Sequence, residues 1–172
     1  MVQFLDNFFN IHLETDVFLL ILLGIANTMP IVSRHIFKEK FSTPIDFNKS
    51  FFDKRPILGT HKTWRGLFSS IIATAIATKL LGYGFILGAK IGFYSMLGDC
   101  VASFIKRRLS LKSGARFIGV DQGIEAFLPL IILKDEIGIS WQDCLFVTFM
   151  FGIFEIIISP YLYKIGFRRN PY

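Results

Sequence analysis

Five long apolar stretches, separated by polar segments, constrain the fold of this chain more than any other feature. They lie near residues 16–35, 66–82, 85–105, 117–134 and 142–164. A helix needs about 20 apolar residues to cross a bilayer. The chain is 52% hydrophobic and contains 20 Phe, which is more apolar than a typical soluble domain. We therefore expect an all-α, polytopic integral membrane helical bundle with five transmembrane helices, forming a single membrane domain.

The distribution of charge predicts how this bundle is oriented. Lysine and arginine gather in the segments at 36–65 and 106–116 and in the C-terminal tail. Five spans place all three segments on one side of the membrane. The other side carries mainly acidic residues and Lys134, and Lys79 and Lys90 can reach it from span ends. The positive-inside rule then puts the N-terminus out, the C-terminus in, and both loops in the cytoplasm. We expect a multi-pass protein of the cell (inner) membrane.

The net charge of +6 follows from this topology, with anionic membrane lipids as a second attraction. It is therefore poor support for nucleic-acid binding, and we expect no nucleic-acid partner. Cys100 and Cys144 fall in or beside predicted spans, which is typical of small buried hydrophobic residues. Gly88, Gly92 and Ser95 share a helix face and predict close helix packing, either within one chain or against a second copy in a homodimer.

Charged side chains inside the third stretch point to a site. Asp99, Ser103, Lys106 and Arg107 are spaced i, i+4, i+7 and i+8, so they share one helical face. A charged side chain at the centre of a membrane helix costs roughly 2.5–3.5 kcal/mol on insertion scales. A carboxylate followed by paired cations can hold a metal and an anionic ligand. The alternative is a salt bridge from Asp99 to another helix, with the cations serving as topology anchors.

Polar residues at the ends of the first two stretches form two further candidate clusters. Pro30 frees a backbone carbonyl one turn earlier, and Asn27 can supply an amide to the bundle interior; a plain helix kink is the alternative. The second stretch opens with a helix N-terminus and cations that suit phosphate, although this cluster taken alone favours the alternative of an interfacial anchor around Trp64. This second cluster comprises Thr60, His61, Lys62, Thr63 and Arg65. Either threonine can cap the helix, and the histidine is expected to be a hydrogen-bonding partner.

The fourth stretch carries Asp121, Gln122 and Glu125. The two carboxylates are four residues apart and face the same way. They repel each other unless a cation lies between them or one is protonated. Structural pairing with Arg107 or Arg116 is the alternative.

Topology brings these four clusters to one cytoplasmic face. Asp99 and Asp121 would approach from adjacent helices, where they can hold one or two Mg²⁺ ions bridged to substrate phosphates. The nearby cations would neutralise charge on a polyphosphate leaving group. Nucleoside triphosphates are available on that side of the membrane.

The four motifs occur in order along the chain and are similar to those of a known family. They are Asn27-x-x-Pro30, Gly59-Thr60-His61-Lys62-Thr63-Trp64-Arg65-Gly66, Gly98-Asp99-x-x-x-Ser103-x-x-Lys106-Arg107-Arg108 and Asp121-Gln122. The chain thereby resembles the CDP-archaeol synthases, small five-span membrane cytidylyltransferases related to CDP-diacylglycerol synthases. The resemblance implies that a lipid phosphate, ester- or ether-linked, attacks the α-phosphate of CTP to give a CDP-activated lipid and pyrophosphate.

The resemblance also implies roles for individual residues. Asp99 and Asp121 look like Mg²⁺ ligands, and with Lys106 and Arg107 they form the expected catalytic set. The expected substrate-binding set is Asn27, Thr60, His61, Lys62, Thr63, Arg65, Ser103, Gln122 and Glu125.

Two positions depart from the family pattern. Ser113 stands where the CDP-diacylglycerol synthase signature has aspartate, and Ile124 stands where archaeal enzymes tend to have a second acid. Glu125 and the following Phe127-Leu128-Pro129 look like the bacterial branch of the family, which we take as the prediction.

A transporter or channel for an anionic solute is the main alternative, because it also predicts intramembrane acids beside cationic mouths. However, the polar residues gather at one face instead of spanning the membrane thickness. Glu155 in the last stretch fits either interpretation. A lipid phosphatase or a CDP-alcohol phosphotransferase would need motifs that the sequence lacks, and a purely structural subunit would not need Asp99 and Asp121.

Overall fold

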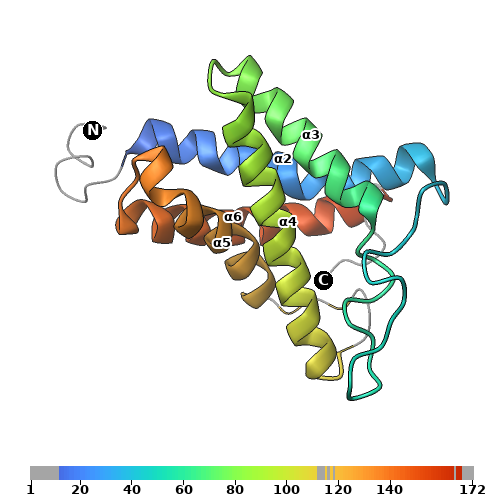
Figure 1. The fold of residues 1–172 in the computed structure, drawn as a ribbon. Helices are drawn as coiled ribbons and strands as arrows, with labels where there is room; N and C mark the ends of the chain where they lie inside the picture. Colours follow the sequence, from blue (N-terminus) through green and yellow to red (C-terminus); the bar gives the residue numbers. More distant parts are fainter. Residues whose placement is uncertain (1–11, 112–114, 116, 118, 165, 168–172) are drawn as a thin grey trace.

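The computed structural model describes residues 12–111, 115, 117, 119–164 and 166–167 (Figure 1). The predictions that concern Ser113 and Arg116, and the basic tail from residue 168, lie outside the described residues.

The described chain folds into helices, in agreement with the predicted all-α class. Three helices, α2, α4 and α6, are long and apolar enough to span a membrane, and this confirms a membrane-helix protein at that coarser level. Helix α3 has 17 residues, about 26 Å at 1.5 Å per residue, and α5 carries several charged side chains. The helices are α2 (Leu13–Phe37), α3 (Trp64–Leu80), α4 (Phe85–Arg108), α5 (Val120–Ile137) and α6 (Trp141–Lys164).

The helix boundaries differ from the predicted ones by a few residues. Helix α5 begins at Val120 instead of residue 117, and α4 continues through Arg108. The basic cluster from Lys106 to Arg108 is therefore the last turn of a helix, and not the start of a loop. Positive side chains are favourable there because the C-terminal end of a helix carries partial negative charge.

Helix α4 is the central element of the bundle. It packs against α2, α3 and α5, while α6 packs against α2 and α5 (Figure 1). Leucines of α2 meet Ile91, Leu130, Val147 and Phe151 in one buried cluster. Large apolar side chains on the outer faces of α3 and α6 are exposed, as expected for helices surrounded by lipid.

Small residues let α3 and α4 approach closely, as their spacing predicts. A Cβ atom added to Gly88 would lie 2.2 Å from Thr78 Oγ1, and one added to Gly92 would lie 3.0 Å from Ile71 Cα. Ser95, one turn further, is also buried. These small-residue faces therefore pack against each other within one chain.

A similar contact joins the two N-terminal motifs. A Cβ atom on Gly66 would lie 3.2 Å from Pro30 Cβ, so the start of α3 rests on the proline of α2. Arg65 strengthens this junction by donating through Nη1 to the carbonyls of Lys38 (2.8 Å) and Lys40 (2.5 Å), just after α2 ends. Asn27 is thereby placed beside the segment that leads into α3.

The segment from residue 38 to residue 63 joins α2 to α3 and forms two isolated β-bridges, Pro44 with Thr63 and Ser50 with Pro56. Its outer part is held on the end of α4 by Arg108, which donates to Asp53 Oδ1 (2.7 Å) and to the Pro56 carbonyl (2.6 Å). The Arg108 guanidinium also lies over the Phe51 and Phe104 rings. These hydrogen bonds and cation–π contacts of Arg108 hold the segment against the end of α4.

Candidate functional site

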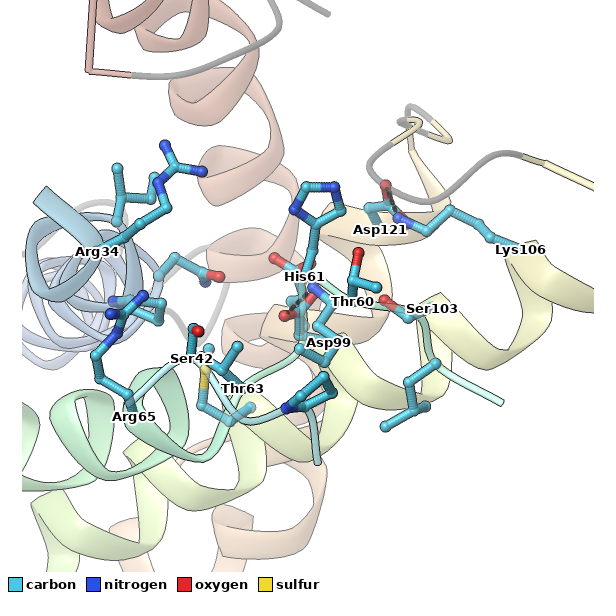
Figure 2. A pocket seen from close by; sticks show the side chains of 18 of the residues that line it. Arg34, Ser42, Thr60, His61, Thr63, Arg65, Asp99, Ser103, Lys106 and Asp121 are labelled. Atoms are coloured by element: carbon cyan, nitrogen blue, oxygen red, sulfur yellow. Dashed lines mark hydrogen bonds and ion pairs between the residues drawn. The ribbon is translucent and has the colours of Figure 1, made fainter. Parts of the chain in front are cut away.

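A cavity of about 610 Å³ lies where the ends of the helices meet the 38–63 segment. Figure 2 shows Asp99, Thr60, His61 and Ser103 near its middle. All thirteen residues predicted for the site line this cavity, from four helices and one connecting segment. They are Asn27, Thr60, His61, Lys62, Thr63, Arg65, Asp99, Ser103, Lys106, Arg107, Asp121, Gln122 and Glu125.

Asp46 fixes the backbone that carries Thr60, His61 and Lys62. Its buried carboxylate accepts from the amides of Asn48 (3.0 Å), Leu58 (2.8 Å) and Gly59 (3.0 Å). Burial raises the pKa of Asp46, but these backbone donors outweigh it and hold the pKa below the ordinary value of 3.8. No sequence pattern indicates this role, because the donors are up to thirteen residues away.

Thr63 is the N-cap of α3. Its side chain accepts a hydrogen bond from the Gly66 amide at 3.2 Å, which selects Thr63 over Thr60 for the predicted cap. Pairing of the Ile45 amide with the Lys62 carbonyl (2.8 Å) aligns the residues just before the cap. Thr60 is left to line the cavity.

Lys62 forms an ion pair with Asp99 of α4. Burial lowers the pKa of the Lys62 ammonium, but the Asp99 carboxylate more than offsets this, so its pKa lies above the ordinary value. Lys62 therefore remains a cation at the wall of the cavity. The predicted alternative of an ion pair for Asp99 is observed, and its partner comes from the connecting segment, not from another helix.

Lys106 and Asp121 form the second ion pair, on the side of the cavity formed by α4 and α5 (Figure 2). Asp121 Oδ2 accepts from Lys106 Nζ (2.8 Å) and from the Phe117 amide (2.9 Å). Both side chains are buried. Lys106 is thus a hydrogen-bonded partner of Asp121 that the sequence interpretation did not propose, and Arg107, one of the two arginines it did propose, is also buried at the cavity wall, where its charge interacts with Asp121. The other, Arg116, lies outside the described residues.

A glycine contact brings the two acid-bearing helices together. A Cβ atom on Gly98 would lie 2.6 Å from the Ile124 carbonyl oxygen and 3.0 Å from Glu125 Cα. The backbones of α4 and α5 touch there, and the carboxyl groups of Asp99 and Glu125 lie within hydrogen-bonding contact. Two carboxyl groups this close need a shared proton or a cation.

The residues present fit a magnesium ion that arrives with substrate. Among the residues that the structure describes, no three or more His, Cys, Asp or Glu side chains form a group able to hold a metal. Mg²⁺ commonly uses one or two carboxylates together with water and substrate phosphates. Asp121 Oδ1 is buried and has no hydrogen-bond partner in the described part of the chain. A buried carboxylate oxygen without a donor is suited to a cation.

The structure adds residues that the sequence interpretation did not assign to the site. Glu155 of α6 lines the cavity, and so do Arg34 and Lys38 near the end of α2. An acid in the middle of an apolar stretch was a signal for Glu155, but the sequence did not show which way its helix faced. The added cations extend the positive lining, which suits a polyphosphate ligand.

The conformation around Asp46 leads to a pH-dependent prediction. Because its pKa is depressed in the folded protein, Asp46 stabilises the segment above pH 3.8, and this contribution is lost as the pH falls below that value. We expect Asp46→Asn, which retains one acceptor oxygen, to reduce hydrogen-exchange protection of the Leu58 and Gly59 amides by about tenfold at neutral pH. Exchange measured by mass spectrometry tests this, with Asp135→Asn as the exposed control. Unchanged protection in Asp46→Asn would contradict the assigned role.

Comparisons with known proteins place the chain among lipid enzymes of membranes. A family model described as CarS-like CDP-archaeol synthase matches residues 9–83 and 79–172. The CDP-archaeol synthase of Sulfurisphaera tokodaii is 36% identical over 77% of this chain and 84% of its own length. That of Pyrococcus horikoshii is 30% identical over 86% of this chain and 89% of its own.

A solved structure shares the fold. It belongs to an intramembrane enzyme for archaeal membrane lipids biosynthesis, with a TM-score of 0.68 and 22% identity over 81% of this chain and 89% of that chain. The arrangement of helices described above is therefore found in a protein that works within a membrane.

Proposed function

This chain belongs to the CDP-archaeol synthase family, and from that premise we propose that its cavity transfers a cytidylyl group from CTP to a lipid phosphate. A phosphate oxygen of the lipid forms a bond to the α-phosphorus of CTP. The bond from that phosphorus to the α,β-bridging oxygen breaks. The products are a CDP-activated lipid and pyrophosphate.

The observation that carries this proposal is the presence of two carboxylate–lysine pairs in one cavity. Lys62 with Asp99 and Lys106 with Asp121 stand at its wall, and Arg107 lies beside the second pair. Fixed cations in a partly dehydrated site stabilise the negative charge that develops on departing pyrophosphate. Their acidic partners keep these cations positioned before substrate binds.

The reaction does not require a general base from the chain. A lipid phosphate is already an oxyanion near pH 7, so the residues need to orient it and screen its charge from the triphosphate. We assign the screening to Lys62, Lys106 and Arg107, and the orientation to polar groups such as Ser103.

We assign Mg²⁺ to Asp99 and Asp121, because both carboxylates line the cavity and Asp121 retains an unpartnered buried oxygen. When bound, the ion would neutralise phosphate charge and polarise the α-phosphorus. The expected consequence for the chain is that Lys62 and Lys106 become available to the phosphates once a cation shares their carboxylates.

We further propose that all five helices cross the cell (inner) membrane, with the N-terminus outside and the cavity facing the cytoplasm. The basic residues around the cavity support this orientation through the positive-inside rule. Assembly as a homodimer stays a prediction, since the small-residue faces of α3 and α4 are used within one chain.

The first test is pyrophosphate release by the purified protein with CTP, Mg²⁺ and a panel of ester- and ether-linked lipid phosphates. We expect release that requires both CTP and lipid. The relatives named above are archaeal, so the lipid that the protein prefers also tests the prediction that it belongs to the bacterial branch. Asp99→Asn is expected to lower this rate strongly, whereas Glu136→Gln, outside the cavity, is not. A folded protein that releases no pyrophosphate with any of these lipids would overturn the proposal and favour the anion-transporter alternative.

A further inference from the structure

The segment between α2 and α3 exposes aromatic side chains that do not line the cavity. Phe52 is 96% exposed, Phe41 71% and Phe47 61%. Phe41 and Phe47 also have positive φ angles, of 57° and 49°, which bulky residues rarely adopt. Exposed apolar side chains gathered in one short segment indicate a surface that contacts something apolar.

The most exposed of these rings belongs to a hairpin formed by residues 49–57. The Phe51 amide donates to the Arg55 carbonyl at 2.8 Å, and the Ile57 amide donates to the Lys49 carbonyl at 3.1 Å. Phe52 lies between these paired residues, at the tip of the hairpin. Its side chain has almost no contact with the rest of the chain beyond the edge of the Phe51 ring, 5.1 Å away between centroids.

Contacts with the last two turns of α4 fix the position of this hairpin. The Phe51 ring meets the Phe104 ring edge-on, with their centroids 5.3 Å apart. Arg108 bonds to Asp53 and to the Pro56 carbonyl, as described above, and Figure 1 shows the segment beside the end of α4. Phe52 is therefore held at the level of the last turns of α4.

That level coincides with the boundary of a membrane. Helix α4 has 24 residues and is about 36 Å long at 1.5 Å per residue, which exceeds the roughly 30 Å of the hydrocarbon core. Its ends therefore reach the headgroup layer. The residues Phe93, Leu97 and Val101 are exposed and share one face of α4, and Phe104 continues this face toward the hairpin. The apolar surface that α4 offers to lipid thus leads to Phe51 and Phe52.

The charges of the hairpin suit an anionic surface. Lys49 and Lys54 are both exposed. The acid of the hairpin, Asp53, is paired with Arg108 at 2.7 Å and lies 4.0 Å from the Arg55 guanidinium. The lysines are therefore the charges that the hairpin presents outward. Aromatic rings next to lysines are typical of segments that lie in the interfacial layer of a membrane and are attracted by anionic lipids.

We propose that the 49–57 hairpin is a membrane contact, with the Phe52 ring inserted between lipid headgroups and with Lys49 and Lys54 on anionic headgroups. The lipids belong to the same membrane that α4 spans. This inference goes beyond the proposed function and does not depend on it. The hairpin ends two residues before Gly59, so contact with lipid also restrains the part of the chain that carries Thr60, His61 and Lys62 along the cavity.

The test places an indole at the tip of the hairpin and measures what reaches it. The variant is Phe52→Trp in a protein that also carries Trp64→Phe and Trp141→Phe, reconstituted in vesicles of phosphatidylcholine with or without phosphatidylglycerol. Because Phe52 is 96% exposed, its replacement leaves the packing of the chain intact. We expect lipids with a nitroxide near the headgroup to quench the indole. We also expect aqueous acrylamide to quench it at least about threefold less than free N-acetyltryptophanamide.

The role of the lysines is tested by the lipid composition. Each lysine close to an anionic surface favours contact about fivefold, so phosphatidylglycerol is expected to increase quenching by the nitroxide lipids. Lys49→Gln combined with Lys54→Gln should abolish this increase. Lys79→Gln is the matched control, because Lys79 is also exposed but lies in the last turn of α3, away from the hairpin. The control should keep the increase.

Three results would count against the proposal. Full access to acrylamide without quenching by lipid nitroxides would overturn the membrane contact. Protection from both quenchers that depends on the ratio of protein to lipid would also overturn it, since it would indicate that a second copy covers Phe52. Lipid quenching that phosphatidylglycerol does not change would overturn the assignment of Lys49 and Lys54. Pyrophosphate release is not part of the measurement, so failure of the proposed function would leave this test unaffected.

Discussion

Replacing Asp121 by asparagine is expected to lower kcat for CTP-dependent pyrophosphate release by at least about 100-fold. The variant keeps the shape of the side chain. It loses one of the two carboxylate oxygens and the negative charge that pairs with Lys106. The variant also removes the negative charge from Asp121 Oδ1, which is buried and has no hydrogen-bond partner in the described chain. This is the oxygen that we assign to Mg²⁺.

The measurement is lipid-dependent pyrophosphate release over a range of Mg²⁺ concentrations. We expect the residual activity of Asp121→Asn to require more Mg²⁺ than the unmodified protein does. Asp135→Asn is the matched control, because its carboxylate is 93% exposed at the other end of α5. A rate for Asp121→Asn within tenfold of the unmodified protein would remove Asp121 from the catalytic set.

Replacing Gly98 by leucine is expected to abolish activity and to destabilise the bundle by about 1–3 kcal/mol or more. The new side chain would begin 2.6 Å from the Ile124 carbonyl oxygen. That atom belongs to a helix backbone, so the clash is relieved only by moving α4 away from α5. Such a movement separates Asp99 from Glu125 and changes the distance between the two ion pairs.

Thermal unfolding in detergent and the pyrophosphate assay test this prediction together. Gly24→Ala is the matched control, because a Cβ atom at Gly24 meets nothing within 4 Å and alanine is the better helix former. We expect the control to be at least as stable as the unmodified protein. Equal stability and activity of Gly98→Leu would show that the contact between α4 and α5 does not set the geometry of the site.

The sequence predicted the helical fold well because a membrane imposes simple requirements on a chain. Backbone polar groups must be paired inside each spanning segment, so long apolar stretches become helices. The structure has a helix at each of the five stretches, with boundaries shifted by a few residues. Successive helices run in opposite directions, and this is why residues as distant as Asn27 and Glu125 reach one cavity.

The sequence could not predict which charges pair within that cavity. Five cations lie in the fifteen residues before Asp121, and the structure shows an ion pair of Asp121 with one of them, Lys106. Arg65 and Arg108 belong to motifs that suit phosphate. In the structure Arg65 also holds the end of α2, and Arg108 holds the connecting segment. Ion pairs depend on separations of a few ångströms between helices, and no local pattern fixes those separations.

What the sequence determined by itself is the set of helices and the side of the bundle on which their polar ends gather, since both follow from hydrophobic length and charge along the chain. What only the tertiary structure decided is the rotation and spacing of those helices. Gly98 allows α4 to touch α5, and Glu155 turns toward the cavity because α6 packs with Gly152 against Gln122. Helix rotation is set by packing between distant residues, whose fit exists only once the helices are assembled.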